Sequence, residues 1–179
     1  MKYIISILLM LIPPFFGYAQ KQTKLGIGAT LEKVSEKDLL LPGAEVNVER
    51  VFNNHFSLSA SLQYGQINNN RNNLKALTTK VTAFYTPFKF NNHKIKIGGG
   101  AGYRNISNQF LESWTENGSG KKYNQLYSDR KYSSAGFHVQ IEDDWKISNR
   151  IILTPNIGYQ YLFQDFQSFS VGIRISYCL

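Results

Sequence analysis

The chain has 179 residues, a formal net charge of +8 and a single cysteine. This length suffices for one domain with its own core, and one cysteine excludes an intrachain disulfide. A basic balance suits nucleic acid or an anionic surface, and the export signal described next argues against nucleic acid as a partner.

The N-terminus has the features of a secretory signal peptide. The stretch MKYIISILLMLIPPFFGYAQ has one early lysine, a short apolar run, a Pro13-Pro14 break and small residues at Gly17 and Ala19. A membrane-spanning helix needs about 20 apolar residues, so this run is too short to be one. We therefore predict a signal peptide at residues 1–19 and one domain at 20–179, with a buried N-terminal helix as the alternative.

The rest of the chain alternates between apolar and polar residues, which is the period of a β-strand with two different faces. The pattern predicts eight strands, at roughly Thr23–Val34, Gly43–Phe52, His55–Gln66, Leu74–Pro87, His93–Arg104, Tyr132–Asp144, Arg150–Leu162 and Phe169–Leu179. Soluble strands usually have about 5 or 6 residues, whereas a strand that crosses a bilayer needs about 9 to 11. Strand length therefore favours a membrane barrel over a soluble sandwich.

The predicted connections alternate between short and long. Short turns fall at Asn53-Asn54, Phe88–Asn92 and Trp145–Asn149, and longer loops at Ser35–Pro42, Gln66–Asn73 and Asn105–Lys131, with a short last connection at Phe163–Asp165. Short turns at one end and long loops at the other are typical of outer-membrane barrels. The sequence thus predicts an all-β fold, an eight-stranded antiparallel up-and-down transmembrane β-barrel with both termini on the periplasmic side.

The polar face of each predicted strand should point into the barrel, because an arginine or lysine facing lipid at the bilayer midplane costs about 2–4 kcal/mol. The charged residues expected inside are Glu32, Glu45, Glu49, Lys80, Lys96, Arg104, Glu142, Asp144 and Arg174. They could line an ion path or form a closed, salt-bridged plug. We favour the plug, because eight strands leave little space in the interior.

The stretch IKIGGGAGYR at residues 95–104 raises the question of a phosphate-binding loop. Such a loop needs a helix directly after it, and the following residues lack helical periodicity. Parity instead places Gly98, Gly100 and Gly102 on the inward face, where they leave room for bulky polar groups from other strands. The glycines are therefore interpreted as architecture.

Three further features concern the strands. Aromatic residues near the strand ends predict interfacial girdles. The predicted girdle residues are Tyr64, Tyr103, Tyr159 and Tyr161 at the outer end and Phe56, Tyr85, Phe88 and Tyr177 at the inner end. The alternative is that they form the aromatic core of a soluble β-domain. Pro155 lies inside the seventh strand and is expected in a bulge. The adjacent pair Ala76-Leu77 suggests a parity shift in the fourth.

The C-terminus carries a family resemblance. Ser170, Gly172, Ile175 and Tyr177 resemble the terminal signal that the barrel-assembly machinery recognises, although the last residue is Leu179 where many members carry Phe. With the signal peptide, the chain resembles the small OmpA/OmpX-like outer-membrane barrels of Bacteroidota. The resemblance implies an outer-membrane location, contact with lipids including lipopolysaccharide, and the barrel-assembly machinery as a partner during biogenesis.

The sequence offers little for catalysis. Lipid A deacylases of similar size place a serine two residues from the catalytic histidine, whereas His138 is followed at that spacing by Gln140. No pair of histidines has metal-ligand spacing, so we expect no catalytic residue, cofactor or metal. We predict a non-enzymatic envelope-structural or surface-binding protein, or a small subunit of a larger complex. The alternatives are a lipid A-modifying barrel enzyme and a soluble, lipocalin-like periplasmic barrel.

The long connection Asn105–Lys131 is the candidate binding surface. Aromatic and basic side chains make good anchors at interfaces, and loops on a rigid scaffold often carry function. The candidate contact residues are Phe110, Trp114, Lys121, Lys122, Tyr123, Tyr127 and Arg130. A loop whose aromatic residues merely cap the barrel is the alternative.

Overall fold

The computed structural model describes residues 22–34, 39–69, 72–116, 122–163 and 166–179. Side chains are described within these ranges except at positions 39, 69, 72, 109–130 and 166. The predicted signal peptide lies outside the described residues. No helix in the described part is long and apolar enough to cross a membrane, a finding that does not bear on strands.

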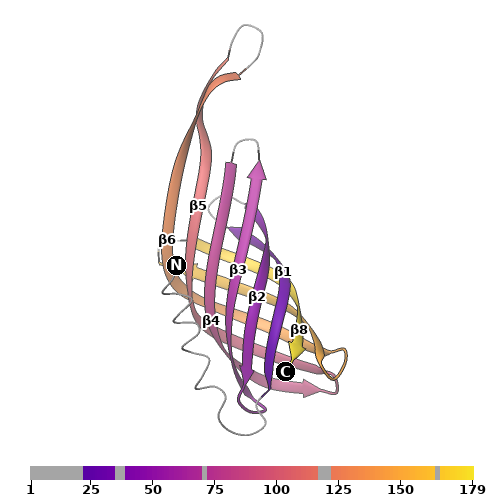
Figure 1. Cartoon of the computed structure of the whole chain (residues 1–179). Helices are drawn as coiled ribbons and strands as arrows, with labels where there is room; N and C mark the ends of the chain where they lie inside the picture. Colours follow the sequence, from indigo (N-terminus) through magenta and orange to yellow (C-terminus); the bar gives the residue numbers. More distant parts are fainter. Residues whose placement is uncertain (1–21, 35–38, 70–71, 117–121, 164–165) are drawn as a thin grey trace.

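Eight antiparallel strands close into a barrel, in which each strand pairs with its neighbour in the chain and β1 pairs with β8 (Figure 1). The strands are β1 (Thr23–Val34), β2 (Leu39–Val51), β3 (Phe56–Asn69), β4 (Asn72–Phe90), β5 (His93–Glu116), β6 (Lys122–Lys146), β7 (Ile151–Leu162) and β8 (Phe166–Cys178). The predicted fold class and strand count are confirmed.

The alternation of side chains gives the barrel an apolar outside and a charged inside. Ile27 and Val139 on the outward face are 69% and 58% exposed, whereas Glu49 and Arg174 on the inward face are each 2% exposed. A soluble lipocalin-like barrel would have the opposite facing, with apolar residues lining the interior. The structure therefore contradicts the lipocalin-like alternative.

Short turns at residues 52–55, 91–92 and 147–150 lie at one end of the barrel, which we call the short-turn end. The Asn53 side-chain oxygen accepts hydrogen bonds from two backbone N–H groups, and the Ser148 hydroxyl does the same in its own turn. Asn91 has a φ of 31°, a left-handed conformation that asparagine tolerates in two-residue hairpin turns. The three short polar connections are therefore confirmed, although the second is shorter than predicted because β4 continues to Phe90.

The opposite end, which we call the hairpin end, differs from the prediction. The predicted loop Gln66–Asn73 is mostly strand, because β3 continues to Asn69 and β4 begins at Asn72. The predicted loop Asn105–Lys131 is a β-hairpin, with β5 running to Glu116 and β6 starting at Lys122, and it projects well beyond the other strands (Figure 1). Strand pairing continues past the apolar belt, where the outward residues Asn105, Ser107 and Lys131 are polar and the alternation of hydropathy is lost.

Strand pairing is perturbed at Pro155, as expected, but the bulge predicted there is found at Pro87. Opposite Pro155 the β6–β7 pairing is interrupted, with no pairs between Glu142↔Asn156 and Trp145↔Leu153, but the register does not change. The bulge expected there lies instead at Pro87, where the β4–β5 register shifts between Tyr85 and Phe88. A bulge removes the need for the N–H that proline lacks.

Two expectations for the inward face need correction. Ala76 is buried inside and Leu77 is exposed outside in regular alternation, so β4 has no parity shift there. The interior at the hairpin end also includes apolar side chains. Leu41, Leu74, Ala76 and Ile106 form a buried cluster there.

The inward glycines are required by close packing. A Cβ on Gly100 would lie 1.8 Å from the carbonyl oxygen of Val81, and one on Gly102 would lie 2.9 Å from Nε2 of Gln160. A Cβ on Gly98 would meet the ring of Phe84 at 2.5 Å, so the bulky group at this position is aromatic rather than polar. The architectural interpretation of the glycines is confirmed.

Candidate functional site

The described part of the barrel interior contains ten charged side chains. The five cations are Lys24, Lys80, Lys96, Arg104 and Arg174, and the five carboxylates are Glu32, Glu45, Glu49, Glu142 and Asp144. All nine residues predicted to point inward do so. Lys24 was missed, although it shares the parity of Glu32 on the same strand. The described interior is thus balanced in formal charge.

Lys96 on β5 lies at the centre of the main cluster. Its Nζ is 2.6 Å from Glu142 Oε2, 2.9 Å from Glu49 Oε2 and 3.2 Å from Asp144 Oδ1. A second ammonium, that of Lys24, lies 2.6 Å from Asp144 Oδ2 and 3.2 Å from Glu49 Oε2. Each of these side chains is almost fully buried, so each carboxylate depends on these ammonium groups for compensation.

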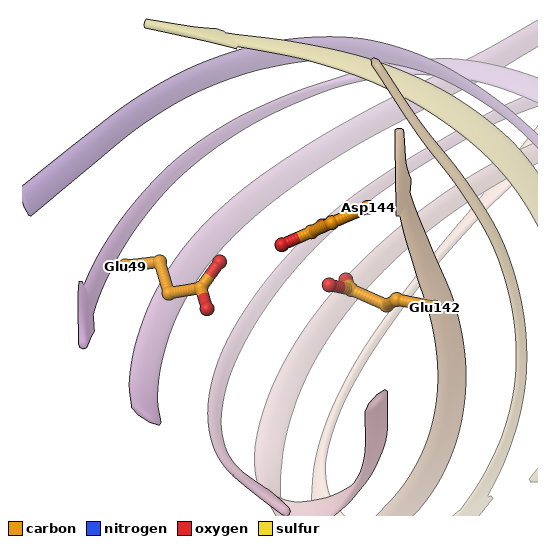
Figure 2. Close-up of side chains that lie close together, drawn as sticks. All are labelled: Glu49, Glu142 and Asp144. Atoms are coloured by element: carbon orange, nitrogen blue, oxygen red, sulfur yellow. The ribbon is translucent and has the colours of Figure 1, made fainter. Parts of the chain in front are cut away.

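The same three carboxylates have the spacing of a cation site. Figure 2 shows Glu49 from β2 facing Glu142 and Asp144 from β6, and one ligand atom from each lies within 4.8 Å of the others. Oxygen donors of this kind suit Ca²⁺ or Mg²⁺. The Lys96 ammonium contacts all three, however, and so already supplies the positive charge. The geometry describes an ion-pair cluster rather than a metal centre.

Two arginines extend the polar network across the barrel. Arg174 Nη2 on β8 donates to both carboxylate oxygens of Glu142, at 2.7 and 2.8 Å, while its Nη1 donates to Glu45 on β2 at 3.0 Å. Arg104 on β5 makes a bidentate contact with Glu32 on β1. The Arg104–Glu32 contact joins opposite walls of the barrel, and Arg174 links β8 to β2 and β6, so these bonds favour the plug over the ion path.

The predicted girdle residues all lie on the outward face. The eight aromatic side chains, four at each end, are between 37% and 55% exposed. At the short-turn end Phe56 and Tyr85 pack with ring centroids 5.3 Å apart, and the Arg150 guanidinium donates to the Tyr177 hydroxyl at 2.8 Å. Exposed aromatic rings at both ends of an apolar belt are typical of a barrel surrounded by lipid.

The three histidines lie at separate places. His138 is buried in the interior, with Nε2 2.7 Å from the Thr82 hydroxyl. His93 is 3.2 Å from Asp143 at the short-turn end, and the His55 ring is 3.1 Å from the Thr86 carbonyl oxygen at the same end. A histidine that served as the catalytic base of a lipid deacylase would have to face outward, toward the lipid. The buried position of His138 argues against a deacylase-like site.

The candidate binding residues belong to the projecting hairpin. Phe110 pairs with Ser128, Thr115 with Tyr123 and Glu116 with Lys122, while β4 follows β5 only as far as Phe110. Lys121 lies outside the described residues, and the side chains of the other six candidates are not described. Their backbone positions correct the predicted loop to a two-stranded ribbon.

The residues of the predicted assembly signal lie along β8. Ile175 and Tyr177 point outward, at 55% and 43% exposure, and the Ser170 hydroxyl donates to the Gly158 carbonyl oxygen at 3.4 Å. Gly172 pairs with Thr30 on β1 and Asn156 on β7, which makes it part of the seam that closes the barrel. Recognition by the assembly machinery stays a prediction.

Comparison with known proteins identifies the fold. No family model and no curated protein matches the sequence. The structure is nevertheless similar to that of a major outer-membrane protein of Thermus thermophilus, with a TM-score of 0.70 and 8% identity over 90% of this chain and 100% of that one.

Two further solved structures have the same fold. Neisserial surface protein A gives a TM-score of 0.65 with 11% identity, over 90% of this chain and 98% of that one. The attachment invasion locus protein Ail of Yersinia pestis gives a TM-score of 0.62 with 10% identity, over 90% of this chain and 100% of Ail. In its complex with the heparin analogue sucrose octasulfate, Ail gives a TM-score of 0.61 with 14% identity. The fold is therefore that of the small eight-stranded outer-membrane barrels.

Proposed function

We propose that this protein is a non-enzymatic outer-membrane barrel that binds anionic saccharide at the cell surface through the β5–β6 hairpin. The single observation that carries this proposal is the projection of that hairpin. β5 and β6 pair out to Glu116↔Lys122, whereas β4 reaches only Phe110 and β7 joins β6 only from Gly136 inward. The barrel holds this ribbon in a fixed direction, away from the apolar belt.

The composition of the hairpin supports a saccharide ligand. Its tip and flanks hold Trp114, Tyr123 and Tyr127, aromatic residues that supply large contact areas, together with the basic candidates Lys122 and Arg130. Arginine and lysine suit phosphate or sulfate groups. Ail, which has the same fold, has been crystallised with a sulfated heparin analogue, a fact about Ail that supports the choice of probe.

The outer-membrane setting of the proposal rests on the apolar belt, the girdles and the similar barrels. The signal peptide at 1–19, the Bacteroidota type and the use of the barrel-assembly machinery remain predictions from the leader and from Ser170, Gly172, Ile175 and Tyr177. In this setting the hairpin end faces the cell exterior. A small subunit of a larger complex would use the same hairpin toward a protein.

The test trims the hairpin at a register pair. Residues 111–127 are replaced by Asn-Gly between Phe110 and Ser128, which lie directly opposite each other, so that a two-residue turn can close the shortened strands. The control changes the connection between β3 and β4 by the single substitution Arg71→Gly. Calorimetric titration with sucrose octasulfate and with lipopolysaccharide should show binding by the wild type and the control, and none by the trimmed barrel.

Topology is checked on intact cells. Trypsin should cut the wild-type chain after Lys121, Lys122, Arg130 or Lys131 without opening the outer membrane. Cleavage only after the membrane is opened would mean that the hairpin faces the periplasm. Unchanged saccharide binding by the trimmed barrel would contradict the functional proposal even if the topology is correct.

A further inference from the structure

The short-turn end of the barrel carries a ring of cations, which we call the basic collar: Arg50, Lys89, Lys94, Lys146 and Arg150. The last four are exposed and Arg50 is half-buried. They come from the ends of β2, β4, β5 and β6 and from the turn before β7, all at the short-turn end, which is the lower end of the barrel in Figure 1. The balanced interior does not contribute to this charge.

Negative charge outside the interior is scarce at this end. Asp143 is the one such acidic residue among those that the structure describes, and it already accepts a hydrogen bond from Trp145 Nε1 at 2.5 Å and lies 3.2 Å from His93. The two arginines of the collar bond to neutral hydroxyl groups, Arg50 to Thr23 and Arg150 to Tyr177. Among the described residues, none of the five collar side chains forms an ion pair with a carboxylate, although the buried carboxylates of Asp144 and Glu49 attract Lys94 from the interior.

The strand register makes the like charges unfavourable in isolation. Lys89 and Lys94 are direct cross-strand partners beside the Asn91 turn. The backbone N–H of Lys146 donates to the Asn92 carbonyl oxygen at 2.8 Å, which brings a third lysine to the same turn. Like charges directly opposite each other destabilise a sheet, so an external anion would relieve this arrangement.

The depth of the collar indicates which anion. The same rim carries exposed apolar side chains on the outward face, including Phe88 at 55%, Trp145 at 38% and Tyr177 at 43% exposure. Aromatic belts lie at the level of lipid headgroups, and cations immediately beyond such a belt are at the depth of the phosphates. Lysine and arginine at this level attract anionic lipids.

From the collar, its register and its depth, we propose that the short-turn end selectively binds anionic phospholipid headgroups in the leaflet that it faces. The ligand chemistry is a phosphodiester with a net negative charge, held by Lys89, Lys94 and Lys146 around the β4–β5 turn. This site is independent of the hairpin and of any saccharide that the hairpin binds.

Trp145 provides a reporter inside the collar. The chain has two tryptophans, so Trp114→Phe leaves Trp145 as the only one. The folded variant is reconstituted into phosphatidylcholine vesicles that contain increasing amounts of dibrominated phosphatidylglycerol or dibrominated phosphatidylcholine. Bromine quenches tryptophan fluorescence only at close range, so the two titrations give the relative binding constant of the anionic lipid beside Trp145.

We expect phosphatidylglycerol to be preferred over phosphatidylcholine by about fivefold for each cation that contacts the headgroup. Lys89→Gln/Lys94→Gln/Lys146→Gln should reduce the preference to near one, and 0.5 M salt should weaken it in the parent. The matched control neutralises lysines at the hairpin end, Lys33→Gln/Lys75→Gln/Lys131→Gln, and should retain the preference.

Heat-resistant electrophoretic mobility confirms that each variant is folded before it is titrated. Equal quenching by the two brominated lipids in the parent would overturn the proposal and would favour an acidic macromolecule as the partner of the collar. A preference that survives the triple collar substitution would also overturn it, because the anion would then be held elsewhere. Neither outcome depends on saccharide binding by the hairpin.

Discussion

Replacing Lys96 with methionine tests the interior charge balance most directly. The substitution keeps the length of the side chain and removes the one ammonium group that contacts Glu49, Glu142 and Asp144 at 2.6–3.2 Å. It leaves four described interior cations for five carboxylates. Lys24 and Arg174 still contact these carboxylates, so the cluster is weakened rather than abolished.

The expected cost is large. At an effective dielectric constant of about 20, each contact near 3 Å is worth about 5 kcal/mol of attraction before the desolvation of the ammonium is subtracted. Removing one partner of a buried ion pair typically costs about 3–5 kcal/mol, because the remaining charge is left uncompensated. We expect Lys96→Met to lose free energy of unfolding in this range, measured by urea titration of the barrel in phosphatidylcholine vesicles with tryptophan fluorescence as the signal.

Two companion variants make the result specific. Lys94→Met removes the same group two residues earlier on β5, where the side chain is exposed, and should change the free energy of unfolding by less than about 0.5 kcal/mol. Adding Glu49→Gln to Lys96→Met restores equal numbers of interior cations and carboxylates and should recover at least about 1 kcal/mol. If Lys96→Met and Lys94→Met change the free energy of unfolding by the same amount, the cluster does not stabilise the barrel and the reasoning is refuted.

Three further predictions concern the outward face, the glycines and the interior. Ile173→Arg, in the middle of the lipid-facing side of β8, should lower the free energy of unfolding by about 2–4 kcal/mol and impair folding into vesicles. Ser59→Ala on the inward face should lower it by only about 1 kcal/mol, through loss of the hydrogen bond from Asn47. Equal losses at the two sites would contradict the assignment of the apolar face to the outside. Gly100→Ala should lower the urea midpoint strongly and Gly99→Ala hardly at all, because the nearest atom to an added Cβ is 1.8 Å away in the first case and 3.7 Å in the second; similar midpoints would refute the packing argument. Planar-bilayer recordings should show no large, stable conductance, and a steady pore-sized current would revive the ion path.

Strand bounds were predicted best where one face of the strand is apolar and outward and the other is polar and inward. The bounds of β1 match the prediction and those of β7 differ by one residue, because the outward residues of both strands are largely apolar along the strand. For β5 and β6 the prediction stopped near Arg104 and Tyr132, where the outward residues become polar. Hydropathy measures the contrast between two faces, and it carries no signal where strands pair with water on both sides.

The candidate site was also predicted only in part: the inward positions were predicted, but not the contacts between them. Parity was enough to place nine charged residues inside, because an inward position needs only the period of the strand. It could not show that Lys24 meets Asp144, since that contact depends on the tilt and stagger with which the barrel closes. It also missed the inward Phe84, whose ring fills space left by Gly98 and lies 4.7 Å from the Lys96 ammonium.

The ion pairs between strands that are distant in the sequence have a consequence for how the barrel assembles. Lys24 on β1 and Asp144 on β6 are 120 residues apart, and Glu45 on β2 and Arg174 on β8 are 129 apart, so neither pair can form within a single hairpin. A sheet that entered the bilayer while still open would present these groups to hydrocarbon without their partners, at a cost of several kcal/mol for each. Insertion and ring closure should therefore be concerted, and the last strand to dock, β8, completes the neutralisation of the first strands to be synthesised.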